Sequence, residues 1–151
     1  KYKGLYASYG FRKGKGHFLK PQTYMNLSGE SVQPCADFFK ITVENILVVH
    51  DELDLPFGTL AFKKGGGLAG HNGLKSISQL LGSRDFMRLR LGIGRPTHGN
   101  VASYVLSNFS SDEKIVLDDF LRGGGEAIDC FMNDGFQKAA KTFSKKNYSE
   151  V

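Results

Sequence analysis

The chain has 151 residues, 40% of them hydrophobic and 23% charged, which is the size and composition of one globular domain. Its longest apolar run, residues 46–49, is far shorter than the ~20 residues of a membrane helix, and no secretion signal opens it. We therefore expect a cytoplasmic protein in which Cys35 and Cys130 are reduced thiols, with a disulfide as the less favoured alternative. A net charge of +5 and a pI near 9.2 favour a polyanionic partner.

The first part of the chain predicts a strand and then a helix. Residues 16–20 indicate a strand that Pro21 closes, and Ser28 or Ser31 is available as the N-cap of the helix. Pro34 is compatible with that helix only in its first turn or at a kink. The apolar face of the helix is expected at Leu27, Val32, Ala36 and Phe39.

The middle of the chain predicts three strands and a second helix. Residues 46–49 indicate a fully buried central strand of the parallel type, and residues 59–63 a short strand. A helix ending at Gly82 follows, and residues 86–93 alternate as a half-buried strand that presents its two arginines together. The apolar face of this helix is expected at Leu74, Ile77, Leu80 and Leu81.

Two helices are predicted at the end of the chain. Ser110 and Glu113 form a capping-box pattern before a long helix to about Asn133, with Gly135 as its C-cap. A short helix follows over residues 136–143. Strands that alternate with helices predict a single domain over residues 1–151, an α/β three-layer sandwich with a mixed, mainly parallel sheet.

Polar side chains gather where these apolar elements end, and loops at such places deliver them to a shared cleft. Asp51 follows the buried strand, where a carboxylate can orient an imidazole and raise its basicity, or can cap backbone amides. Asn26 and Asn72 have the donors and the acceptor needed to hold a water or a carbonyl. The four clusters are Tyr24-Met25-Asn26, His50-Asp51, His71-Asn72 and the basic set Lys63, Lys64, Arg88 and Arg90.

Two other kinds of site are weaker alternatives. His50, Asp51 and Asp54 could bind a metal, but no second histidine stands at helical ligand spacing, so we expect no metal. Gly65-x-Gly67-x-x-Gly70 formally matches a dinucleotide fingerprint. The strand before it ends in two lysines and no acidic residue ends the next strand, so we expect no nicotinamide cofactor.

Four motifs resemble bacterial-type peptidyl-tRNA hydrolases in order and spacing, and the resemblance runs from about residue 1 to the C-terminus. They are PQTYMNLSG at 21–29, VHDELDLP at 49–56, GGGLAGHNGLK at 65–75 and RLRLGIGRP at 88–96. The resemblance implies a twisted mixed sheet between helices and a monomeric cytoplasmic esterase. Its substrate would be the bond between a peptide and the 3′ ribose of tRNA, cleaved without metal or cofactor.

The resemblance also implies roles for single residues. Tyr24 and Asn26 would contact the tRNA end and the peptide backbone, and Asp51 would hold the catalytic histidine in its basic form. Asn72 would bind substrate and help to fix the water, with His71 as an auxiliary polar group. Lys63 and Arg90 would clamp the terminal phosphate of the tRNA, with Arg88 and Lys64 as helpers, which positions a substrate without reading its sequence.

One departure from the family concerns the general base. The family opens with a strand and a Thr-Arg-His-Asn motif whose histidine is the base, and this chain begins after that segment, so we expect an N-terminally truncated form. None of the histidines takes its place; they are His17, His50, His71 and His98. Because a general base contributes ~10²–10⁴-fold of rate, this chain alone should hydrolyse peptidyl-tRNA poorly. A catalytically impaired tRNA-binding domain is therefore the alternative function.

Overall fold

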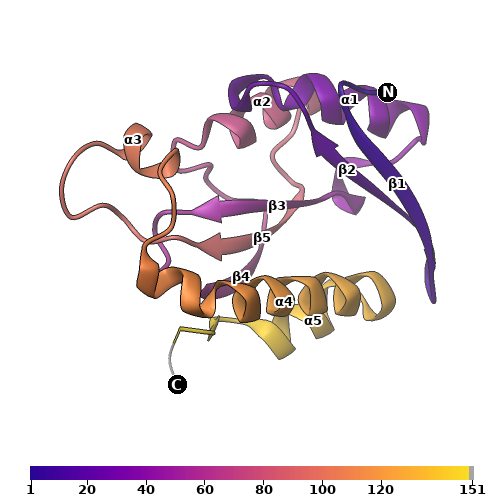
Figure 1. Cartoon of the computed structure of the whole chain (residues 1–151). Helices are drawn as coiled ribbons and strands as arrows, with labels where there is room; N and C mark the ends of the chain where they lie inside the picture. Colours follow the sequence, from indigo (N-terminus) through magenta and orange to yellow (C-terminus); the bar gives the residue numbers. More distant parts are fainter. Residues whose placement is uncertain (150–151) are drawn as a thin grey trace. The chain divides into compact units, whose positions relative to one another are not determined.

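The computed structural model describes residues 1–149, whose helices and strands are labelled in Figure 1. It divides into two compact units. The first unit comprises Lys1–Val48 and Lys64–Arg88, and the second comprises Val49–Lys63 together with the chain from Leu89 onward. Within residues 1–149, none of the helices is both long enough and apolar enough to cross a membrane.

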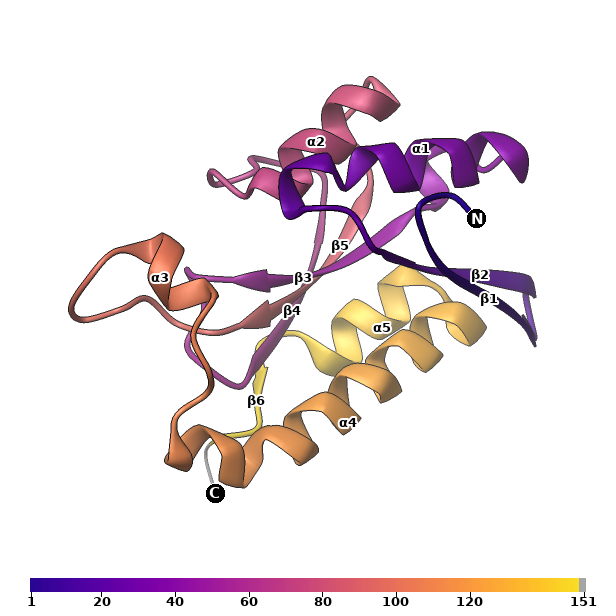
Figure 2. The same cartoon turned by 45° about the horizontal axis from the view of Figure 1, so that its top comes forward.

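The first unit combines a hairpin with two helices. Strands β1 (Gly4–Phe11) and β2 (Gly14–Pro21) pair antiparallel, with Phe11 opposite Gly14 across a two-residue turn. The predicted strand at 16–20 is thus confirmed, as one half of a hairpin whose other strand was not predicted. The other elements are η1 (Met25–Leu27), α1 (Gly29–Phe38), η2 (Val43–Asn45) and α2 (Asn72–Leu81) (Figure 2).

The apolar face of α2 forms the core of this unit. Leu74 and Ile77 pack with Phe86, and all three side chains are buried. Helix α2 ends at Gly82, which takes the left-handed conformation (φ 74°) that a side chain would disfavour, so both the predicted helix and its end are confirmed. Half-buried apolar side chains pack around these three: Val32, Val43, Ile46, Val48, Leu68 and Leu81.

A four-stranded sheet, whose strands lie largely in the second unit, has the order β3-β5-β4-β6. Hydrogen bonds from Met87 to Ile46 and from Ile93 to Glu52 show that β3 and β5 run parallel. Those from Gly58 to Gly92 and from Gly65 to Phe86 make β4 antiparallel to β5, and β6 is antiparallel to β4. The strands are β3 (Leu47–Glu52), β4 (Thr59–Lys64), β5 (Met87–Gly92) and β6 (Lys146–Asn147).

The helices of the second unit are α3 (Val101–Val105), α4 (Ser111–Asp134) and α5 (Phe136–Phe143). Both halves of the predicted capping box are present: Glu113 N donates to Ser110 Oγ and Ser110 N donates to Glu113 Oε1. The ring of Phe62 on β4 contacts those of Phe131 on α4 and Phe136 on α5. The mixed sheet and its helices confirm the α/β class, although β3 and β5 are the one parallel pair among the described strands.

One local prediction was wrong, and one was narrowed to a single alternative. Strand β3 lies at an edge of the sheet that residues 1–149 form, and Val49 is 43% exposed, so it is not a fully buried central strand. A run of four apolar residues does not distinguish an edge strand from a central strand. Pro34 is the sixth residue of α1, which excludes the first turn, and the alternative of a kink stays a prediction. Its ring lies on the exposed side of the helix.

Candidate active site

The start of α2 and the short helix η1 bring two of the predicted polar clusters together in the first unit. The amide of Gly29 donates to Ser76 Oγ over 2.9 Å, which ties the start of α1 to α2. A Cβ at Gly73 would lie 2.6 Å from Met25 Sδ, so η1 packs tightly on the first turn of α2. The Tyr24–Asn26 segment therefore adjoins the start of α2, where Asn72 follows His71.

The side chains of these two clusters remain accessible to a ligand. Asn26 and Asn72 are exposed, and Tyr24 is 82% exposed. Their backbones are held by the buried contacts of Gly29 and Gly73, so the polar groups are presented by a rigid junction. Such an arrangement suits substrate binding, because a backbone that is already ordered loses little conformational entropy when a ligand binds.

His71 acts as the N-cap of α2. Its Nδ1 accepts the hydrogen bond of the Leu74 amide over 3.2 Å, in extended backbone geometry (φ −68°, ψ 114°). An Nδ1 that accepts leaves the proton of the neutral ring on Nε2. In this state His71 offers its other nitrogen as a donor and not as a base.

The glycine loop between β4 and α2 is held by a buried arginine. Nη1 of Arg88 donates to the carbonyl oxygen of Gly67 over 2.9 Å, and Arg88 is 2% exposed. The prediction of a half-buried strand that presents Arg88 together with Arg90 is therefore wrong for Arg88, which is buried. The guanidinium of Arg88, on β5, holds the loop that leads to His71.

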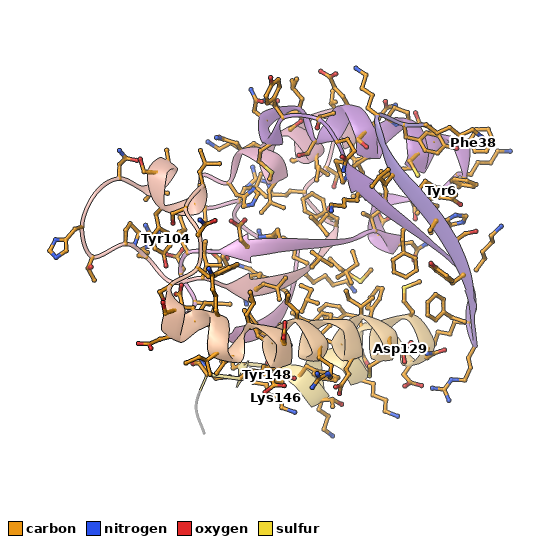
Figure 3. The ribbon with its side chains drawn as sticks, in the orientation of Figure 1. Tyr6, Phe38, Tyr104, Asp129, Lys146 and Tyr148 are labelled. Carbon is orange, nitrogen blue, oxygen red and sulfur yellow. The ribbon has the colours of Figure 1, made fainter. Side chains whose placement is uncertain are left out.

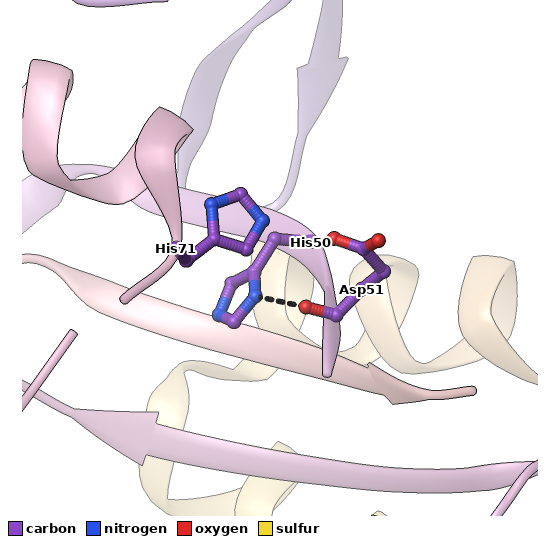
Figure 4. Close-up of side chains that lie close together, drawn as sticks. All are labelled: His50, Asp51 and His71. Atoms are coloured by element: carbon purple, nitrogen blue, oxygen red, sulfur yellow. Dashed lines mark hydrogen bonds between the residues drawn. The ribbon is translucent and has the colours of Figure 1, made fainter. Parts of the chain in front are cut away.

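The second unit carries the predicted acidic group and the two clamp cations. His50 and Asp51 lie in β3, Asp51 is half-buried, and His50 Nδ1 donates to the backbone oxygen of Asp51 over 2.8 Å (Figure 4). Because a carbonyl only accepts, this bond places the proton of the neutral ring on Nδ1 and makes Nε2 the basic nitrogen. Lys63 on β4 and Arg90 on β5 are half-buried and belong to neighbouring strands.

His50 and Asp51, both in the second unit, are of residue types that bind divalent metals. In the neutral tautomer of His50 the nitrogen with a lone pair is Nε2, whereas in that of His71 Nε2 carries the proton. The expectation of a metal-independent site stays a prediction.

Sequence reasoning missed a groove that begins beside Tyr24. It has a volume of about 510 Å³, and the ammonium of Lys3 at its rim pairs with Glu30 Oε1 over 2.7 Å. Lys3 precedes a strand that was not predicted, so no pattern connected it with Tyr24. The groove is lined by Lys3, Gln22, Thr23, Tyr24, Leu27 and Glu30.

Residues 1–150 match the family model of peptidyl-tRNA hydrolase. The chain belongs to the peptidyl-tRNA hydrolase family. It is 52% identical over 128 residues to the peptidyl-tRNA hydrolase of Geotalea uraniireducens, covering 85% of this chain and 67% of the relative. Identity to the enzyme of Pelobacter propionicus is 44% over 149 residues, with 99% and 77% covered.

Solved structures give the same family. The crystal structure of peptidyl-tRNA hydrolase from Acinetobacter baumannii superposes with a TM-score of 0.88 at 32% identity, covering 98% of this chain and 75% of that one. A complex of peptidyl-tRNA hydrolase with N-propanol gives 0.88 at 33% identity, with 97% and 74% covered. The family resemblance of the four motifs is confirmed, whereas the truncation, the absent base and the site residues stay predictions.

Proposed function

We propose that this chain acts on peptidyl-tRNA and hydrolyses the ester between the peptide and the 3′ ribose, without a metal or cofactor. The observation that carries the proposal is the family match over residues 1–150. The junction of η1 with α2 supports it, because the exposed side chains of Asn26 and Asn72 stand on two segments that pack against each other there. We further propose that the protein is a cytoplasmic monomer.

In the proposed site the side-chain amides of Asn26 and Asn72 bind the substrate. Asn26 contacts the peptide backbone, while Asn72 binds the ester region and fixes the attacking water. The exposed ring of Tyr24 contacts the end of the tRNA by stacking, for which an aromatic side chain on the surface is suited. His71 lines this part of the site and positions the start of α2.

Asp51 is proposed to hold a basic imidazole in its working orientation. A carboxylate beside an imidazole favours the charged form and so raises the basicity of the ring. Within this chain His17 is bound to Tyr6, and His71 has Nδ1 engaged as an acceptor. His50 is buried with Nδ1 as the donor, which gives it the tautomer of a base at Nε2.

The second candidate function is binding of tRNA without efficient hydrolysis. The specific observation in its favour is that His71 is in the tautomer unsuited to a base, and the motif that carries the base in the family does not occur among these 151 residues. Binding and hydrolysis should be measured on the same sample, with an N-acetylated aminoacyl-tRNA as substrate. Binding with turnover ~10²–10⁴-fold below that of a relative supports the impaired form, and near-normal turnover rejects it.

Asp51→Ala distinguishes a chemical role from a structural one. In a chain that carries the base histidine, we expect turnover to fall at least tenfold while the Kd for tRNA stays within twofold. Asp51→Asn preserves the shape of the side chain and should lose turnover equally. Equal loss of turnover and binding would instead assign Asp51 to the fold.

Lys63 and Arg90 are proposed to bind the terminal phosphate of the tRNA. Each contact releases counterions, so Lys63→Ala or Arg90→Ala should weaken tRNA binding and reduce its salt slope by about 1. Lys141→Ala, at an exposed cation on α5, is the matched control and should leave both quantities unchanged. An unchanged slope in the Lys63 and Arg90 variants would reject the clamp.

A further inference from the structure

The hairpin formed by β1 and β2 carries a one-sided charge. Residues 1–21 contain six lysines and arginines and no aspartate or glutamate. All six are exposed, and three of them lie at or beside the turn between the strands. The six are Lys1, Lys3, Arg12, Lys13, Lys15 and Lys20.

One face of this hairpin is fixed to the end of α1. Tyr6 and His17 lie on it, and Tyr6 Oη and His17 Nδ1 are 2.6 Å apart in a hydrogen bond. The ring of Phe39 stacks on both, at 5.3 Å from Tyr6 and 4.1 Å from His17 between ring centres. Tyr2 joins Tyr6 to Phe38 in the same aromatic cluster (Figure 3). The hairpin is therefore held against α1 in the first unit by this aromatic packing.

The opposite face is aromatic and open. Side chains alternate along a strand, so Leu5, Tyr9 and Phe11 share a face, and the register adds Phe18 and Lys20. Phe18 contacts the rings of Tyr9 and Phe11, with ring centres 5.7 and 5.9 Å apart. Tyr9 is nevertheless 60% exposed and Leu5 62% exposed. This face presents aromatic surface to solvent beside a group of cations.

We propose that the open face of the β1–β2 hairpin binds RNA, with unpaired bases stacked on Tyr9 and phosphates contacted by Lys20 on that face and by Lys13 in the turn. Cations without neighbouring carboxylates on the same element attract a polyanion, and an exposed ring distinguishes a nucleic acid from an acidic protein because every base has a face that stacks. The surface does not depend on the ester site, so its failure and that of the proposed function are separate results.

The test measures binding of a fluorescein-labelled ten-residue adenylate RNA by anisotropy, between 50 and 200 mM KCl. Lys13→Gln/Lys20→Gln should weaken binding about tenfold at 0.1 M KCl and lower the salt slope by roughly 1.4, since each phosphate contact on a single strand contributes about 0.7. Tyr9→Ala should weaken it about fivefold, and Tyr9→Phe, which keeps the ring, should bind like the parent.

Matched controls separate this surface from general positive charge. Lys138→Gln/Lys141→Gln removes two exposed cations of α5 and should bind the RNA like the parent. Parent-like binding by the Lys13/Lys20 variant would overturn the proposal, as would equal loss in the α5 variant or in Tyr9→Phe. Deca-glutamate bound as tightly as the RNA would also overturn it, in favour of an acidic protein. Unchanged circular dichroism and Tm show that each variant is folded.

Discussion

Two glycines, Gly29 in the first unit and Gly123 in the second, each allow another part of the chain to pack closely against a helix, but the packed groups differ. At Gly29 a Cβ would collide with the backbone of α2, where the carbonyl carbon of Ser76 would be 2.8 Å away. At Gly123 it would collide with the ring of Tyr148, whose Cε2 would be 2.6 Å away. Backbone cannot yield without moving a helix, whereas a ring can rotate. The first contact positions the candidate site, and the second holds Tyr148 against α4 (Figure 3).

The largest effect is expected for Gly29→Ala. The added methyl must separate α1 from α2 and lengthen the bond from Gly29 N to Ser76 Oγ, so the free energy of unfolding should fall by about 3 kcal/mol. For a chain of this length, that lowers Tm by roughly 6–12 °C. Thermal unfolding followed by circular dichroism measures it.

Gly125→Ala is the matched control for that change. Nothing lies within 4 Å of a Cβ at Gly125, which is in the interior of α4 and exposed. Alanine is the better helix former by about 0.5–1 kcal/mol, so this variant should be slightly more stable than the parent. Equal destabilisation of the Gly29 and Gly125 variants would contradict the contrast between them.

A smaller loss is expected for Gly123→Ala. The gain in helix propensity offsets part of the clash with Tyr148, which leaves a net destabilisation of about 1 kcal/mol. In a Tyr148→Ala background the ring is gone, so Gly123→Ala should then stabilise the protein. Denaturant unfolding of the four proteins in this cycle gives the coupling energy between the two positions. Additive effects would show that the ring of Tyr148 does not occupy the space beside Gly123.

The smallest change in the free energy of unfolding is expected for Tyr104→Phe, and it should depend on pH. Its hydroxyl donates to the carbonyl oxygen of Ile93, and burial, followed by the nearby carboxylate of Glu113, raises the pKa of Tyr104. A raised pKa means that the neutral phenol stabilises the fold below about pH 10 and that this contribution is lost as the pH rises through the folded-state pKa. Tyr104→Phe should therefore cost about 1 kcal/mol at pH 7 and less above pH 10. Urea unfolding at both pH values tests it, and an equal loss at both would be inconsistent with this titration.

Local signals in the sequence were enough for much of the fold. The capping box of Ser110 and Glu113 and the left-handed end at Gly82 depend on neighbouring residues, and both were predicted. The edge position of β3 and the burial of Arg88 depend on distant partners that no local pattern encodes. The same holds for β1, whose Gly-rich, aromatic sequence has no clear alternation, and for β6, which is two residues long.

The candidate site divides in the same way. The polar clusters could be located because they stand where apolar elements begin or end, and the adjoining of Asn26 with the start of α2 was expected from that placement. The tautomers of His50 and His71 could not be predicted, since each follows from one hydrogen bond to backbone. The engagement of Arg88 with Gly67 in place of solvent needed the three-dimensional path of the glycine loop.

The most direct measurement is a double-mutant cycle of Asn26→Ala and Asn72→Ala on the Kd for an N-acetylated aminoacyl-tRNA, which requires no turnover. If both amides hold one substrate end, each single variant should weaken binding, and the pair should show a coupling energy of at least about 0.5 kcal/mol. Strictly additive losses, or single variants that bind like the parent, would contradict a shared site at the junction of η1 and α2.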